Sequence, residues 1–212
     1  MLAATWLEWR AVRRALTAHR ELGIDLGEVI RCGVGLRRWA PPADSSPALI
    51  TCGLAGGLRP DLQPGTVVIA EAVALEGGEP VVCDPGWVRA LVTGARACGH
   101  EPAVGPVLTA RRPVVGAARR TWAQRGFLAV EMETALLAPS RAPLGSLRVI
   151  LDAPSREMSS KWAAPGRAVL DPRRWGEMLW LATRAPRYAR RAALCLAAGL
   201  EEHAKPEPQP HG

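Results

Sequence analysis

Three acidic positions in this chain each follow a short apolar stretch, and together they could perform acid–base chemistry. Glu131 and Glu133 come after an apolar run that ends at Val130, Asp152 follows a second run, and Glu8 follows the apolar N-terminus. Charged groups at the edge of an apolar core are costly unless something there requires them. The carboxyl ends of strands form the ligand-binding edge of an open α/β sheet, so we expect these acids to meet at one site.

Cleavage of an N-glycosidic bond is one reaction that uses three such acids. Its transition state resembles an oxocarbenium ion, the leaving base needs a proton, the sugar hydroxyls must be held, and water needs a base. Each acid also has a structural interpretation that the sequence leaves open. Glu131 and Glu133 could cap a helix N-terminus, Asp152 could be a loop acid, and Glu8 could belong to the first turn of a helix.

A glycine-rich segment, Gly53-Leu54-Ala55-Gly56-Gly57, follows another expected strand. Glycines at such a place allow the backbone to approach a ligand closely. The segment matches neither the dinucleotide-binding pattern nor the P-loop pattern. A tight turn is the alternative interpretation.

The elements that must position these residues alternate between strands and helices. The strands are expected at Leu2–Thr5, Val29–Val34, Ala48–Cys52, Thr66–Leu75, Val104–Thr109, Phe127–Val130 and Leu147–Leu151. Apolar residues at helical spacing predict helices over Glu8–Leu22, Trp87–Cys98 and Val114–Gln124, with a helix-like stretch over Thr134–Ala138. The alternation predicts a single-domain α/β fold with a central mixed, mostly parallel sheet flanked by helices.

Composition narrows the class of protein. With 212 residues, 48% of them hydrophobic, the chain can bury one substantial core. Five widely spaced cysteines without a C-x-x-C pair favour reduced thiols in a cytoplasmic protein. The four histidines are isolated, so we expect no metal site and no cofactor.

The N-terminus lacks the basic region of a signal peptide, and no apolar run reaches the ~20 residues of a membrane span. The net charge of +7 could serve nucleic acid or an anionic membrane, or it could reflect an arginine-rich composition. Phe and Tyr occur once each, which disfavours stacking on nucleic acid. Nucleic acid is therefore not an expected partner.

The C-terminal part of the chain is richer in arginine and ends in a Pro-rich segment. We therefore divide the chain into an α/β domain at 1–170, a basic helical extension at 171–203 and a disordered tail at 204–212. Two helical stretches are expected, one beginning near Trp175 and one over Ala192–Leu200. Six arginines and one acid lie between Arg173 and Arg191. Such helices, which also carry Trp175, Trp180 and Tyr188, suit docking on an anionic membrane. The alternative is that they pack on the domain or at a subunit interface.

Taken in order, these segments resemble the nucleoside phosphorylase and nucleosidase superfamily, and in particular its 5′-methylthioadenosine/S-adenosylhomocysteine nucleosidases. The matching stretches are Thr5–Glu8, Gly33-Val34-Gly35, Cys52–Leu58 with Pro64-Gly65, Ala129–Glu133 and Val149–Asp152. The arginine-bearing Gly-Asp-Pro-x-Arg segment of the phosphorylases is absent, so the resemblance favours hydrolysis, with phosphorolysis as the alternative. It also implies a homo-oligomer.

The resemblance implies a role for each matching residue. Asp152 corresponds to the general acid that protonates N7 of the departing purine, and Glu8 to the acid that positions the attacking water. Glu133 corresponds to the acid that holds the ribose hydroxyls, and Met132 to the residue that packs on the sugar. The remaining implied substrate-binding residues are Glu131, Gly53, Leu54, Ala55, Gly56 and Val114.

A narrower resemblance concerns Gly105–Thr109, Arg112-Pro113-Val114 and Leu170-Asp171-Pro172. These segments are similar to the hopanoid-associated branch, which implies release of adenine from adenosylhopane, a lipid nucleoside, and contact with the inner face of the membrane. Two alternatives stay open. One is a nucleosidase of small soluble methylthioadenosine-type substrates, and the other is a degenerate member that binds a nucleoside or a membrane without catalysis.

Overall fold

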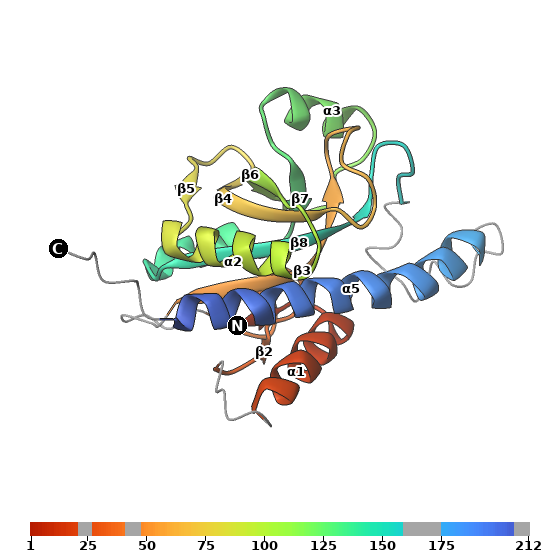
Figure 1. The fold of residues 1–212 in the computed structure, drawn as a ribbon. Helices are drawn as coiled ribbons and strands as arrows, with labels where there is room; N and C mark the ends of the chain where they lie inside the picture. The colour runs from red at the N-terminus through yellow and green to blue at the C-terminus, as the bar shows by residue number, and fades with distance from the viewer. Residues whose placement is uncertain (21–26, 41–47, 159–174, 206–212) are drawn as a thin grey trace.

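The computed structural model describes residues 1–20, 27–40, 48–158 and 175–205, and these form a central sheet covered by helices (Figure 1). The sheet has eight strands. They are β1 (Leu2–Ala3), β2 (Ile30–Arg31), β3 (Leu49–Gly57), β4 (Val67–Leu75), β5 (Val81–Val82), β6 (Ala103–Thr109), β7 (Ala129–Glu131) and β8 (Leu144–Asp152). The two-residue strand β5 has no counterpart in the sequence prediction, because two valines between turns give too short a pattern.

Five of the strands close into a ring. β3 pairs with β7 and β8, β4 pairs with β6 and β8, and β6 pairs with β7. The pairs β1–β2, β1–β3, β3–β8, β4–β6 and β6–β7 are parallel, and the pairs β3–β7, β4–β5 and β4–β8 are antiparallel. The predicted mixed, mostly parallel sheet is therefore confirmed. Closure brings the ends of β3, β7 and β8 together.

The helices are α1 (Trp6–Arg20), α2 (Pro85–Ala97), α3 (Ala117–Gln124) and α5 (Trp175–Ala204), with 3-10 turns η1 (Val34–Leu36) and η2 (Thr134–Ser140). In Figure 1, α2 and α5 lie along one face of the sheet with α1 beside α5, while α3 lies at the opposite side. α2 begins at an N-cap, Asp84, whose carboxylate accepts a hydrogen bond from the Trp87 N–H at 2.9 Å. The predicted helices are confirmed within the described residues, although α3 begins three residues later than Val114. The predicted end of the first helix, at 21–22, lies outside the described residues.

The C-terminal helix differs from its prediction, because the two expected helical stretches form one continuous helix, α5. From Tyr188 onward it packs into the core, where Tyr188, Cys195 and Leu196 are buried with residues of α1, α2 and β8. α2 and α5 cross in direct backbone contact, since a Cβ on Gly94 would lie 2.2 Å from the Gly199 nitrogen. The packing alternative therefore holds for this half of the helix.

The glycine-rich segment also differs from its prediction. Gly53–Gly57 is the second half of β3, so the tight-turn interpretation is wrong and the strand runs five residues beyond Cys52. The pairing of β3 with β8 holds this segment extended through Gly56, with a register shift between Ala55 and Gly56. The backbone of a sheet strand thus reaches the site directly.

Two further expectations concern residues that the structure does not describe. The domain boundary at 170/171 lies outside the described residues, and so does most of the predicted tail, from 206 onward. The predicted strand over Val29–Val34 is shorter in the structure, which has β2 at Ile30–Arg31 and then the turn η1. Among the described helices, none has the length and apolarity needed to cross a bilayer.

Candidate active site

A cavity of about 660 Å³ opens where β3, β7 and β8 end, and the sequence-predicted residues meet there. Of the ten predicted site residues, nine line this cavity. They are Glu8, Leu54, Ala55, Gly56, Val114, Glu131, Met132, Glu133 and Asp152. The tenth, Gly53, lies directly behind Glu8. Residues far apart in the sequence are thus brought together by the closure of the sheet.

Glu8 joins the first helix to β3. Its Oε2 accepts hydrogen bonds from the Thr5 N–H and hydroxyl at 2.8 and 2.7 Å, and the Glu8 N–H is 3.3 Å from the Thr5 hydroxyl oxygen. This is a capping box, which satisfies first-turn N–H groups of a helix. Its Oε1 accepts the Leu54 N–H at 2.7 Å. The first-turn interpretation is therefore right, and Oε1 keeps a lone pair for a ligand.

Only glycine fits behind Glu8. A Cβ on Gly53 would lie 2.2 Å from Oε1 of Glu8 and 3.2 Å from Nη1 of Arg148. We expect Gly53→Ala to push the Glu8 carboxylate away from β3 and to cost about 1–3 kcal/mol of stability, as overpacking does. Urea unfolding measures this cost.

Gly78→Ala is the matched control, since the nearest atom to its added Cβ would lie at an ordinary 3.4 Å. If both variants unfold at the same urea concentration, the close packing of Gly53 on Glu8 is not present in solution.

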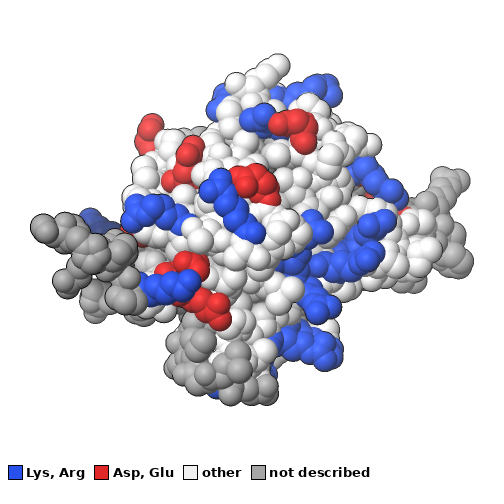
Figure 2. All heavy atoms as spheres, in the orientation of Figure 1, with Lys and Arg blue, Asp and Glu red and all other residues white. Residues whose placement is uncertain are grey.

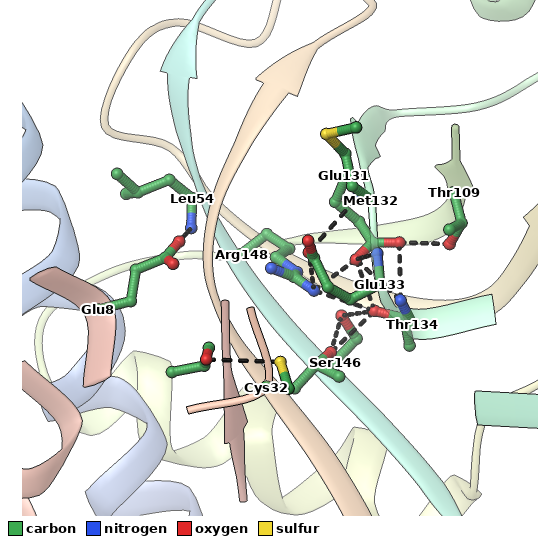
Figure 3. A network of polar contacts seen from close by, with 12 residues as sticks. Glu8, Cys32, Leu54, Thr109, Glu131, Met132, Glu133, Thr134, Ser146 and Arg148 are labelled. Carbon is green, nitrogen blue, oxygen red and sulfur yellow. Dashed lines mark hydrogen bonds and ion pairs between the residues drawn. The ribbon is translucent and has the colours of Figure 1, made fainter. Parts of the chain in front are cut away.

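Glu131 is the centre of a buried polar network (Figure 3). It forms an ion pair with Nη2 of Arg148, and it accepts hydrogen bonds from the Thr109 hydroxyl and from the Glu133 N–H at 3.0 Å. The Thr134 N–H also donates to it, at 3.0 Å, which caps the turn η2. The capping interpretation therefore holds for Glu131 and is wrong for Glu133, whose side chain makes no cap hydrogen bond to η2. Five protein donors bind Glu131. Among the described residues only the Gly35 and Met132 N–H groups donate to Glu133, so Glu133 has more capacity left for a ligand.

Glu133 has fewer partners than Glu131, and its pKa is raised. Its Oε1 accepts the Gly35 N–H at 3.0 Å, and its Oε2 is 3.6 Å from Nη2 of Arg148. Burial raises the pKa of Glu133 to about 7; Arg148 opposes the shift and Glu131 adds to it. Arg148 lies closer to Glu131, so Glu133 receives less of its compensation. Burial therefore favours the protonated, uncharged form of Glu133.

The raised pKa of Glu133 predicts how stability depends on pH. Between about pH 4.5 and about pH 7 the carboxyl is ionised in the unfolded chain and protonated in the folded one. The folded state then binds more protons, so stability falls as pH rises through this window and levels off above it.

Urea unfolding of wild type and Glu133→Gln below, within and above the window tests this dependence. We expect the glutamine variant to lose the decline. A decline of equal size in both proteins would assign it to another group.

Asp152 is held by a buried arginine that the sequence analysis did not identify. Oδ2 of Asp152 accepts hydrogen bonds from Nη2 of Arg119 at 2.5 Å and from the Met158 N–H at 2.9 Å. The side chain of Arg119 is 5% exposed, and its other donors reach the carbonyls of Val114 and Gly57 at 2.9 and 3.0 Å. Oε1 of Glu157 also lies 3.4 Å from Nε of Arg119. The guanidinium is therefore held by two carbonyl oxygens and two carboxylates.

The sequence analysis did not identify Arg148 either, although its position within an apolar run marks it as unusual. It interrupts an otherwise apolar strand between Leu147 and Val149, and a charge in such a place needs a buried partner. Arg119 carries no such signal, because it is one of 27 basic residues and lies in a polar stretch.

Apolar side chains form most of the remaining cavity wall, which Thr5, Arg112 and Arg119 also line. Leu7 comes from α1, Val34 from η1, and Leu181 and Ala185 from the first half of α5. Leu54, Leu151 and Met158 complete this wall next to the acids. The cavity therefore combines a carboxylate cluster with a wide apolar side.

The fold is that of the nucleoside phosphorylase-like α/β proteins. Among solved structures, the chain is similar to the 5′-methylthioadenosine/S-adenosylhomocysteine nucleosidase of Neisseria meningitidis in complex with methylthio-immucillin-A. The TM-score is 0.68 and the sequence identity 18%, and the match covers 94% of this chain and 96% of that one. It is also similar to the corresponding Helicobacter pylori enzyme with 5′-methylthioadenosine in the active site (TM-score 0.66, 15% identity, 95% and 96% covered). Helicobacter pylori futalosine hydrolase is similar as well (TM-score 0.66, 14% identity, 95% and 96% covered).

Residues 43–159, more than half of the chain, match the family model described as the phosphorylase superfamily. The chain belongs to that superfamily. No curated protein gives a significant sequence match. The structural likenesses, at 18% identity or less, concern the fold alone.

Proposed function

We propose that this protein hydrolyses the N-glycosidic bond of an adenine nucleoside that carries a large apolar 5′ substituent. The observation that carries this proposal is the cavity itself, in which Glu8, Glu133 and Asp152 face one space beside an apolar wall. Acids alone would suit many polar ligands. Their combination with an apolar wall suits a ligand with a sugar at one end and an apolar group at the other.

Each of the three acids takes one part of the reaction. The C1′–N9 bond breaks and its electron pair leaves with the base, while Asp152 gives a proton to N7 of the purine. Glu133 accepts hydrogen bonds from the ribose hydroxyls and holds the sugar as it becomes oxocarbenium-like. Water on the Oε1 side of Glu8 attacks C1′ and gives up a proton to that carboxylate. The products are adenine and the free sugar with its 5′ substituent.

The wall formed by Leu7, Leu181 and Ala185 supports a substrate with a bulky apolar group. Adenosylhopane, the lipid nucleoside implied by the narrower sequence resemblance, has such a group, and we propose it as the substrate. A methylthioadenosine-type nucleoside is the second candidate, which the likeness to the Neisseria meningitidis nucleosidase favours.

The experiment is adenine release by the purified protein, without phosphate, from adenosylhopane and from methylthioadenosine in parallel. Release mainly from the lipid nucleoside is expected. Release mainly from methylthioadenosine would replace the lipid substrate with a soluble one. Release only after phosphate is added would make the reaction phosphorolysis, and no release in any condition would overturn the enzymatic proposal.

We further propose that the face formed by α1 and the middle of α5 contacts an anionic membrane. A groove of about 710 Å³ between these helices is lined by Trp6, Leu194 and small apolar residues, with Arg10, Arg14 and Arg190 among its walls. Figure 2 shows basic side chains gathered over this part of the surface. Arginines beside exposed apolar side chains suit the interface of a bilayer with anionic lipid. Tyr188, expected at this contact, is instead buried in the core.

Sedimentation with lipid vesicles tests the membrane contact. We expect binding to anionic vesicles and none to neutral ones, with a loss on the order of 100-fold when Arg10, Arg14 and Arg190 are replaced by Ala, at about 1 kcal/mol for each arginine. Replacing the exposed Arg89, Arg120 and Arg125 is the control, and equal losses in both triple variants would refute a specific face.

Two expectations stay predictions. The division into a domain at 1–170, an extension at 171–203 and a tail at 204–212 is tested by limited proteolysis. The homo-oligomer implied by the resemblance is tested by light scattering of the purified protein.

A further inference from the structure

The Asp152 carboxyl has two oxygens in different surroundings. Both protein donors, Nη2 of Arg119 and the Met158 N–H, bind the same oxygen, Oδ2. The other oxygen, Oδ1, lies beside Gly56, where an added Cβ would be 3.1 Å away, and both Gly56 and Asp152 line the cavity. No bond from the described residues to Oδ1 is present. The carboxyl thus has one oxygen bound by the protein and one turned to the ligand space.

Arg119 is rigidly placed to maintain this difference. Its Nε donates to the Val114 carbonyl and its Nη1 to the Gly57 carbonyl, so only Nη2 remains for the acid. A guanidinium held in this way has one orientation, because its donors form a planar fork. It has no lone pair to accept a proton, and it blocks protonation at Oδ2. A proton on Asp152 must therefore lie on Oδ1, on the side of the cavity.

We propose that Arg119 is a positioning residue that selects Oδ1 of Asp152 as the oxygen that carries the proton to the leaving purine. The proposal rests on the function proposed above, in which Asp152 protonates N7. When the proton leaves Oδ1, the carboxyl becomes a buried anion, and Arg119 remains as its paired cation. Without Arg119 the carboxyl can rotate about its Cβ–Cγ bond and present either oxygen, so the proton is misdirected in part of the molecules.

The test compares Arg119→Met, Arg119→Lys and the control Arg120→Met in the full chain. Arg120 is the exposed neighbour on the same helix, α3. We expect Arg119→Met to lower kcat about 10- to 100-fold, as misplacement of a reacting group does, with KM changed less than about 3-fold. Arg119→Lys, which keeps a charge and a single donor nitrogen, should recover part of kcat, and Arg120→Met should match the wild type. A wild-type kcat in Arg119→Met, or a raised KM with unchanged kcat, would overturn the proposal.

A thermal double-mutant cycle with Asp152→Asn keeps the two proposals separable. Each single change leaves one buried charge without its counter-charge, whereas the double change removes both charges. We therefore expect the double variant to lose less in Tm than the two singles combined. If the wild type releases adenine from no nucleoside, the proposed function fails, and this cycle still decides the coupling of Arg119 to Asp152. Additive losses in Tm would show that the pair is not formed in solution, and the inference would then fail by itself.

Discussion

Asp152→Asn is expected to abolish adenine release, with a loss of about 10³-fold or more, while the protein stays folded. The asparagine oxygen can still accept the Arg119 and Met158 donors that bind Oδ2. Its amide group then faces the cavity in place of Oδ1 and has no acidic proton to give to the purine. General acid catalysis contributes about 10²–10⁴-fold, so loss of the acid removes most of the rate. Initial rates of adenine release measure the effect.

Asp61→Asn is the matched control for this substitution, because Asp61 is an exposed acid that pairs with Arg59 on the surface. Circular dichroism of both variants checks that the fold is kept. A folded Asp152→Asn protein that keeps a tenth of the wild-type rate would remove Asp152 from the role of general acid and leave the reaction to another group.

Arg148→Met is expected to have the largest effect on stability. Arg148 is 2% exposed, forms an ion pair with Glu131, donates to the Thr134 hydroxyl at 3.1 Å and lies near Glu133. Removing the cation leaves these acids buried without compensation. Breaking a buried pair in this way costs about 3–5 kcal/mol. Urea unfolding at neutral pH measures the loss.

Two variants define the cause of that loss. Arg31→Met changes an exposed arginine of β2 and should shift stability by no more than about 0.5 kcal/mol. The double variant Arg148→Met, Glu131→Gln should recover part of the lost stability, since it also removes one of the uncompensated charges. If the double variant is as unstable as Arg148→Met, packing volume and not charge is what Arg148 supplies.

The sequence predicts much of the fold, because the sheet strands are apolar runs bounded by turns and the helices carry apolar residues at helical spacing. Asp152, Glu133 and Glu8 could be identified because each ends or follows such a run. The extended conformation of Gly53–Gly57 could not, since glycine alone indicates a turn and only the pairing with β8 holds it in the sheet. The continuity of α5 was hidden for a similar reason, as the arginines and Pro186 in its middle interrupt the apolar pattern.

The partners of the acids were harder to predict than the acids. Arg119 lies 33 residues before Asp152 in the chain, and the bond between them forms only when α3 packs beside the end of β8. Nothing local distinguishes it from its exposed neighbour Arg120. The charge of Glu133 likewise depends on how one arginine is shared between two acids, which is a property of the folded network.

The two ends of α5 lie in different surroundings, one beside the cavity and one in the core. Leu181 and Ala185 stand in the cavity wall, and ten residues further on Cys195 and Leu196 are sealed in the core. A substitution at Leu181, which is only half-buried, can therefore alter the room for a ligand while the anchored half keeps the helix in place. Changes at Leu181 are therefore expected to alter ligand preference more than folding. Directed evolution of substrate range should begin there.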